Sequence, residues 1–239
     1  NIKISLRMNS KYGIICFLFS FICFLSCLGI KAQTSKVGIV FDADTTLICQ
    51  HVGLTIFSNS TNELPLNVNM QESLVQNLKA YLETKYVVDI IELPDSLKNK
   101  DLGLFDSGIG KKLSKWAETK GKDFDIIVFI RNQDIPGEWN VIVPQNTNGV
   151  YSRQKKTYLY TTITFYAYRT SSAKLLEYYN QGGESLHKLK NFKLPKDKKT
   201  FSPESLSFLE EEYKRYLDQR IKYFLAKTYL IPNIDQSVH

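Results

Sequence analysis

The sequence predicts an α/β (α+β) fold, in which a mixed β-sheet has helices packed mainly on one face. Three observations support this prediction. Short β-branched segments alternate with segments of helical periodicity, one mid-chain strand is almost entirely apolar, and a long amphipathic helix lies near the C-terminus. The 239 residues are 43% hydrophobic and 23% charged. This composition excludes a disordered polymer, a collagen-like repeat and a multi-pass membrane protein.

Two β-branched segments open the fold. Lys36–Asp42 (KVGIVFD) and Val52–Phe57 (VGLTIF) both have the composition of strands. Only nine residues separate them, which is too short for the helical crossover that a parallel pair requires. We therefore expect the sheet to open with an antiparallel strand pair.

The next segments alternate between helix and strand. Asn69 is a candidate N-cap of a helix, with Glu72 in the position of a capping box. Tyr86–Leu93 (YVVDIIEL) predicts a third strand, and a second helix is expected to stop at Gly121. Phe124–Arg131 (FDIIVFIR) is predicted to be the central strand, because it is nearly all apolar.

The stretch Lys156–Arg169 alternates strictly and predicts one long strand with two different faces. One face carries Leu159, Thr161, Ile163, Phe165 and Ala167, and the other carries Tyr158, Tyr160, Thr162, Thr164, Tyr166 and Tyr168. A turn at Thr170–Ser172 should return the chain as a further strand, Ala173–Tyr179.

The last predicted element is a long C-terminal amphipathic helix. Ser202 is its expected N-cap and Pro203 its first residue, and Pro232 ends it. Its inner stripe runs from Leu206 to Thr228 at helical spacing, whereas acid-before-base pairs four residues apart lie on the opposite side.

The first 32 residues predict an export signal. Arg7 and Lys11 precede Ile14–Leu28, an apolar run broken only by serines and cysteines, and Met8 fits a translation start. We therefore assign residues 1–32 to a signal peptide or N-terminal anchor and residues 33–239 to a single α/β domain.

Three outcomes for this leader remain open. Cleavage after Ala32 would give a secreted or periplasmic protein, and lipidation of Cys27 would give a lipoprotein. Retention of the whole segment would anchor the protein, because about 20 apolar residues span a bilayer. All three place the domain outside the cytosol, in the periplasm or cell envelope.

Charge and cysteine content follow from the leader. The formal net charge is +7, but without residues 1–32 only 27 basic side chains face 24 acidic ones. We therefore expect no nucleic-acid partner.

Three of the four cysteines lie in the leader, so Cys49 has no partner for an internal disulfide. Its apolar neighbours predict a buried small side chain rather than a reactive thiol.

The segment Asp42-x-Asp44-x-Thr46 follows the first strand and resembles the first motif of haloacid-dehalogenase-type phosphotransferases. The resemblance implies Asp42 as nucleophile, Asp44 as general acid/base and a bound Mg²⁺. Ser58, the candidate for the second motif, comes only fourteen residues after Asp44, and no late acidic pair follows a strand. We therefore favour a polar hairpin connection with no catalytic residue, metal or cofactor, and keep a metal-dependent phosphohydrolase as the alternative.

Aromatic side chains supply the candidate binding residues. Tyr158, Tyr160, Tyr166 and Tyr168 share one strand face, and such rows can stack on sugars or bases. Trp139, in a proline-flanked loop, is a second exposed-aromatic candidate. Alternatively, a helix covers the tyrosine face, or that face is a solvent-facing sheet surface made of good strand formers. Trp139 could instead pack against the edge of the core.

A basic stretch precedes the last helix. Lys188–Lys199 carries six lysines and one aspartate. It could meet anionic lipid headgroups, a polyanionic glycan or nucleic acid, or it could be a solvated linker. We favour the solvated linker, because only one aromatic residue interrupts the charges.

The run VGLTIFSN (residues 52–59) resembles a V-G-x-T-x-F-x-N signature of exported bacterial envelope proteins that have no established activity. In them an opening strand pair precedes a helix, a VxxxxL strand, a central DxxVxV strand, a Gly-containing turn and a paired tyrosine-bearing strand. The matching pieces here are Val87–Leu93, Asp125–Ile130, Asn148–Tyr151 and Tyr160–Ser171.

The layout is also similar to the small α/β domains of envelope assembly lipoproteins of the curli-secretion type, as an analogy of fold. These resemblances imply a location and a fold rather than a reaction. We therefore expect an exported, non-catalytic protein that binds or assembles with an envelope component, whether a protein, a glycan or a lipid surface.

Overall fold

The computed structural model describes residues 35–53, 59–98, 108–120, 122–132, 147–172, 174–178, 186–195 and 201–234. The chain divides into two units after Thr34, and the fold below is that of the unit Ser35–His239. The predicted leader, residues 1–32 with Cys27, lies outside the described residues. No helix in the described part of the chain combines the length and the apolar character needed to cross a membrane.

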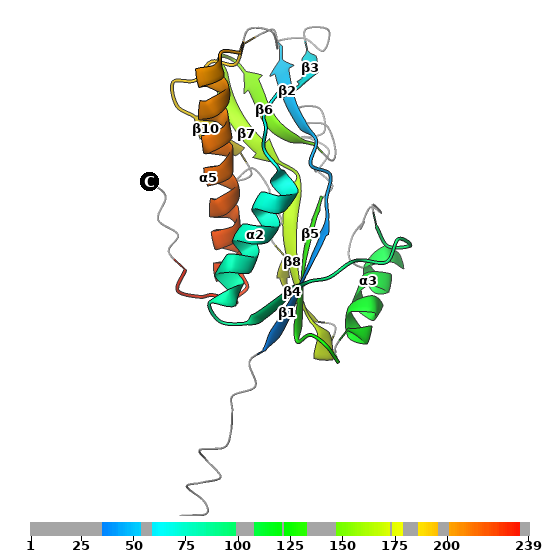
Figure 1. Cartoon of the computed structure of the whole chain (residues 1–239). Helices are drawn as coiled ribbons and strands as arrows, with labels where there is room; N and C mark the ends of the chain where they lie inside the picture. The colour runs from blue at the N-terminus through cyan, green and yellow to red at the C-terminus, as the bar shows by residue number, and fades with distance from the viewer. Residues whose placement is uncertain are drawn as a thin grey trace, which may run out of the picture. The chain divides into compact units, whose positions relative to one another are not determined.

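Two five-stranded sheets form the frame of the unit (Figure 1). Sheet A has the order β4-β1-β5-β8-β9. Strands β4, β1 and β5 run parallel to one another, β8 runs antiparallel to β5, and β9 runs antiparallel to β8. Its strands are β1 (Lys36–Asp42), β4 (Val87–Ile90), β5 (Ile126–Asn132), β8 (Ile163–Arg169) and β9 (Lys174–Tyr178).

Sheet B has the order β10-β7-β6-β2-β3, with β2 and β6 parallel and the other neighbours antiparallel. Its strands are β2 (Leu47–Val52), β3 (Ser60–Glu63), β6 (Asn148–Arg153), β7 (Lys156–Thr161) and β10 (Leu186–Leu189). Outside the sheets lie α2 (Met70–Glu83), α3 (Gly108–Thr119), the short 3₁₀ turn η2 (Thr170–Ser172) and α5 (Pro203–Lys227).

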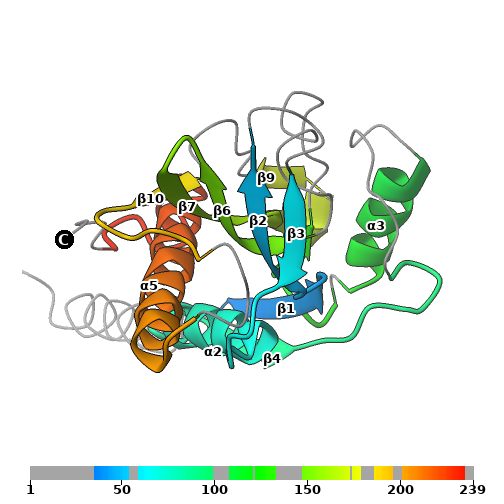
Figure 2. The same ribbon diagram turned by 90° about the horizontal axis from the view of Figure 1, so that it is seen from above.

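The three described helices cover the sheets unequally. Helices α2 and α5 lie on one side of sheet A and α3 on the other (Figure 2). The larger core joins α2 and α5 to one face of both sheets, and its members include Leu78, Phe165, Leu159 and Phe224. The smaller core packs Leu113 and Ala117 of α3 against the opposite face of sheet A. The predicted mixed α/β fold with helices mainly on one face is therefore confirmed.

The antiparallel pair expected at the start of the sheet is wrong. Strand β1 bonds to β4 and β5, whereas β2 begins five residues after Asp42 and bonds to β3 and β6 in the other sheet. The expected second strand began at Val52, where β2 ends, and residues 54–58 lie outside the described part of the chain. The error arose because Gln50 and His51 interrupt the apolar pattern of β2 and hide a strand within the expected connection.

The predicted long strand is divided at Thr162 into β7 and β8, which belong to different sheets. Its alternation nevertheless continues across the division. Leu159, Ile163 and Phe165 face the larger core, whereas Tyr166 and Tyr168 face α3. Periodicity predicted the faces correctly, but the change of sheet depends on partner strands elsewhere in the chain.

The predicted starts of α2 and α5 are confirmed, whereas α5 ends at Lys227, before the expected Pro232, and Gly121 lies outside the described residues. The Asn69 side chain accepts a hydrogen bond from the Glu72 backbone N–H, as in a capping box, and its amide also donates to the Glu72 carboxylate. Ser202 caps α5 in the same way, with Pro203 as the first helical residue. The expected return through residues 170–172 into β9 is also present, whereas β10 lies partly in the stretch expected to be a linker.

Candidate functional site

Asp42, the first carboxylate of the phosphotransferase-like motif, ends β1 opposite Arg131 of β5. Its Oδ2 accepts a hydrogen bond from Arg131 Nη2 at 2.7 Å, and the two side chains are only 4% and 3% exposed. A buried carboxylate whose charge is already neutralised by a guanidinium is a poor ligand for Mg²⁺ and a poorly placed nucleophile. The geometry favours a structural role for Asp42.

Asp44 is exposed and lies in the connection between β1 of sheet A and β2 of sheet B. Its Oδ1 accepts a hydrogen bond from the Thr46 backbone at 2.7 Å, which is the geometry of an Asx-turn, and its own N–H donates to the Asn132 side chain. Among the described residues, no group of three His, Cys, Asp or Glu side chains could hold a metal ion. The arrangement favours the expected polar connection, although it joins two sheets rather than two strands of a hairpin.

A polar network joins two of the places where the chain passes between the sheets, the β1–β2 connection and Thr162 between β7 and β8. Asn148 Nδ2 donates to the Asp44 carbonyl at 2.9 Å, and Asn148 Oδ1 accepts from the Thr161 hydroxyl and from the Thr162 N–H. Asn132 Nδ2 donates to Thr162 Oγ1 at 2.7 Å. Sequence analysis missed this role, since the pair Asn148-Gly149 is typical of a turn and here begins β6.

The tyrosine face expected to bind ligands is largely interior. Tyr160, Tyr166 and Tyr168 are only 2–4% exposed, so they form no exposed stacking surface in this structure. Tyr168 packs edge-on against Phe129, and burial raises the pKa of its hydroxyl to about 12. Tyr158 alone of the four is half-buried. The other aromatic candidate, Trp139, lies outside the described residues.

Tyr158 belongs to the face of sheet B opposite α5, which we call the outer face. Its ring stacks on that of Tyr151, with centroids 5.0 Å apart. Val52 and Leu186, both half-buried, belong to the same small cluster, which contains no residue of the described helices. Gln50, the neighbour of Tyr151 in the sheet, is 6% exposed, and its Oε1 has no hydrogen-bond partner among the described residues.

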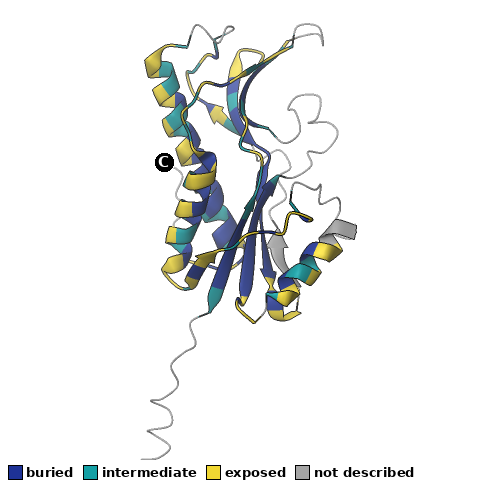
Figure 3. Ribbon diagram, turned by 45° about the vertical axis from the view of Figure 1, so that its right-hand side comes forward, coloured by how far each residue is buried: buried dark blue, intermediate teal, exposed yellow. Residues whose placement is uncertain are grey.

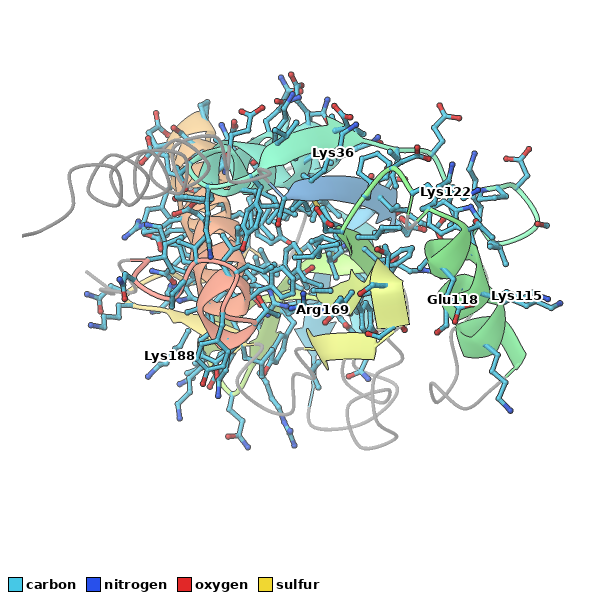
Figure 4. All side chains as sticks on the ribbon, turned by 90° about the horizontal axis from the view of Figure 1, so that it is seen from below. Lys36, Lys115, Glu118, Lys122, Arg169 and Lys188 are labelled. Atoms are coloured by element: carbon cyan, nitrogen blue, oxygen red, sulfur yellow. The ribbon has the colours of Figure 1, made fainter. Side chains whose placement is uncertain are left out.

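Three exposed cations border Tyr158 on the outer face, and we call them the cationic row: Arg153, Lys156 and Lys188. Arg153 pairs with Lys156 across the β6–β7 hairpin, and Lys188 pairs with Tyr158. Strand alternation places all three on the face of Tyr151 and Tyr158. Figure 4 shows Lys188 extending away from the ribbon. No ion pair found among the described residues involves the row.

In comparisons with known proteins, no family model matches the chain and no curated protein matches it. Function is therefore inferred from the residues themselves. The two motif aspartates bond to Arg131, Thr46 and Asn132, whereas the outer face of sheet B combines exposed cations with a half-buried aromatic ring. The sequence signals for this face were Tyr158 and the lysine-rich stretch, but their juxtaposition depends on the pairing of β7 with β10.

Proposed function

We propose that the protein is an exported envelope protein that binds an anionic glycan through the outer face of sheet B. The observation that carries this proposal is the cationic row, aligned by strand register beside Tyr158. The cations match carboxylate or phosphate groups, and a half-buried tyrosine ring offers a surface on which a sugar can stack. The basic, apolar leader and the V-G-x-T-x-F-x-N resemblance support export to the envelope.

Binding by this face has to be multivalent. An exposed ion pair contributes only about 0.2–1 kcal/mol, so one carboxylate would be held weakly. A polymer that repeats its charge along the chain can meet several cations at once, and its second and third contacts are effectively intramolecular. Such binding weakens with salt, because charges are screened over about 8 Å at physiological ionic strength.

The proposal is tested by co-sedimentation of the purified protein with peptidoglycan sacculi, an insoluble glycan that bears carboxylates. We expect the protein to sediment with the sacculi at low salt and to be released at high salt. The double substitution Arg153→Glu, Lys156→Glu should weaken binding about tenfold or more, which corresponds to about 1.4 kcal/mol. Tyr158→Ala should weaken it several-fold.

A matched control reverses two exposed cations on α3, Lys112→Glu and Lys115→Glu. Lys115 points away from the sheet (Figure 4), so this variant has the same net charge as the test variant but leaves the outer face intact. Equal loss of binding in both variants would reduce the effect to net charge and refute the site. Binding to phosphatidylglycerol vesicles but not to sacculi would refute the glycan as partner.

The alternative, a phosphohydrolase that uses Mg²⁺ with Asp42 and Asp44, makes a separate demand. The Asp42 carboxylate would have to leave its ion pair with Arg131 and contact the metal and the phosphorus atom instead. Mg²⁺-dependent hydrolysis of a phosphate ester, lost in a folded Asp42→Asn variant, would support this alternative over the structural role.

A further inference from the structure

A serine and a histidine lie side by side on the inner face of sheet B, the face that packs toward α5. His51 of β2 and Ser152 of β6 are partners in the parallel register, and both are half-buried. Ser152 Oγ lies 2.7 Å from His51 Nδ1, and His51 Nε2 lies 2.7 Å from the carbonyl oxygen of Pro195. Strand alternation places both on the side of Cys49 and Val150, opposite the cationic row.

The Pro195 carbonyl determines which imidazole nitrogen carries the proton. A carbonyl oxygen can only accept, so Nε2 donates to it. In a neutral imidazole Nδ1 is then the acceptor, and the Ser152 hydroxyl donates to it. The three groups are therefore a hydroxyl, a base within hydrogen-bond reach and a third group that orients the base, the arrangement that activates a nucleophilic serine.

The orienting carbonyl is fixed independently of His51. The loop that follows β10 is held to sheet B by Thr157, whose Oγ1 donates to the Phe192 carbonyl at 3.0 Å. The Phe192 ring stacks on Phe208 of α5, with centroids 5.3 Å apart, and Leu194 is buried. A base whose partner is held in place keeps its orientation during a reaction, which is a requirement of a preorganised site.

We propose that Ser152 is a nucleophile activated by His51 for acyl transfer from a carboxylic ester. Ser152 Oγ bonds to the acyl carbon as its proton passes to His51 Nδ1, and the departing alcohol takes that proton when its C–O bond breaks. Water then attacks the acyl-serine and gives a proton to Nδ1, and the Ser152 oxygen recovers it as the carboxylic acid leaves. The net reaction converts ester and water into acid and alcohol, and Nε2 keeps its hydrogen throughout.

This activity goes beyond the proposed glycan binding and does not depend on it, since the two sites occupy opposite faces of sheet B. A purely structural His51 would make the same two hydrogen bonds and would simply fasten the loop at Pro195 to the sheet. The two roles differ in the reactivity of the Ser152 hydroxyl, because an ordinary serine does not react with mild electrophiles.

The test uses a tagged fluorophosphonate on the purified protein, with the modified residue identified by peptide mass spectrometry. Reaction forms a bond between Ser152 Oγ and phosphorus and breaks the P–F bond, and the proton leaves with fluoride. We expect modification at Ser152, its loss in Ser152→Ala, and a rate at least 100-fold lower in His51→Gln, in line with the usual contribution of a general base. Ser60→Ala is the matched control, because Ser60 is exposed and pairs with His51 from the other side.

A second measurement keeps the test decisive if His51→Gln fails to fold. Unfolding the wild-type protein in urea must abolish modification, because the dyad exists only in the folded sheet. A folded wild-type protein that stays unmodified at Ser152, under conditions that modify a serine esterase, overturns the proposal. So does modification that persists at full rate in folded His51→Gln. Sacculus binding by Ser152→Ala, measured in parallel, shows that loss of one site leaves the other.

Discussion

Sheets A and B belong to one unit of the chain, yet they use their faces differently. Sheet A is covered on both sides, by α2 and α5 on one and α3 on the other, and its strands β1, β5 and β8 are buried along most of their length (Figure 3). Sheet B packs one face toward α5, whereas its outer face carries the cationic row and Tyr158. Under the proposed function, sheet A stabilises the fold and sheet B presents the groups that bind the glycan.

The largest expected effect is at the buried ion pair of sheet A. Asp42→Ala removes the carboxylate that pairs with the buried Arg131 guanidinium, so we expect the free energy of unfolding to fall by about 3–5 kcal/mol. Equilibrium urea unfolding measures this loss. Arg131→Met should cost a similar amount, and the double variant Asp42→Leu, Arg131→Met less than either single change.

Asp44→Ala is the control for that prediction, because its exposed side chain makes a local turn bond worth only about 1 kcal/mol. If Asp42→Ala proved no more costly than Asp44→Ala, the ion pair would not be structural, and the phosphohydrolase hypothesis would regain its strongest residue.

Two glycines, one in each sheet, sharpen the comparison. Gly149 of β6 has φ +136°, and a Cβ there would lie 2.0 Å from the Ile48 carbonyl oxygen, which is backbone and cannot move aside. Gly149→Ala should therefore destabilise the protein by about 3 kcal/mol. At Gly38 of β1 a Cβ would meet the end of the flexible Ile91 side chain at 2.7 Å, so Gly38→Ala should cost about 1–2 kcal/mol.

Urea unfolding of both variants tests this order. A larger loss of unfolding free energy for Gly38→Ala would mean that the side chains around β1 adjust less readily to an added methyl group than the backbone of β2 beside Gly149. That result would reverse the inferred difference between the sheets at these positions.

Sheet A was largely predictable because its signals are local. The apolar run of β5, the capping box at Asn69 and the Ser202-Pro203 start of α5 each depend on a few neighbouring residues. Sheet B was not, because β3 is short and polar and β2 contains Gln50 and His51. Strands of that kind are specified by their cross-strand partners rather than by their own composition.

The candidate sites divide in the same way. The aspartate motif was visible, but its partner Arg131 belongs to another strand, and only the β1–β5 pairing shows that Asp42 is neutralised. His51 and Ser152 lie 101 residues apart, so no spacing rule could have joined them. Of the four predicted tyrosines only Tyr158 is half-buried, because the burial of Tyr160, Tyr166 and Tyr168 depends on packing that the alternation pattern does not encode.

The Cys49 thiol provides a probe of local opening in sheet B. It is buried between sheet and helix, and burial raises its pKa from about 9 to about 11, so at pH 8 little thiolate is present and access requires opening. We expect a thiol-disulfide reagent to react at least 100-fold more slowly with the folded protein than with the urea-unfolded chain. Gly149→Ala should raise the folded-state rate by more than its loss of global stability accounts for, and rates in both variants that simply follow their free energies of unfolding would show that Cys49 responds only to global unfolding.

The smallest expected effect is the alkaline dependence that the same thiol adds to stability. Between pH 9 and pH 11 the unfolded chain has lost the Cys49 proton while the folded protein retains it, so the free energy of unfolding falls as pH rises across this window. Tyr151 and Tyr168, whose pKa values burial raises from 10 to about 12, contribute a similar fall at higher pH. Cys49→Ala should therefore flatten the stability profile between pH 9 and pH 10 and leave the steeper fall above it. A profile identical to that of the wild-type protein would mean that the thiol already reaches solvent in the folded sheet.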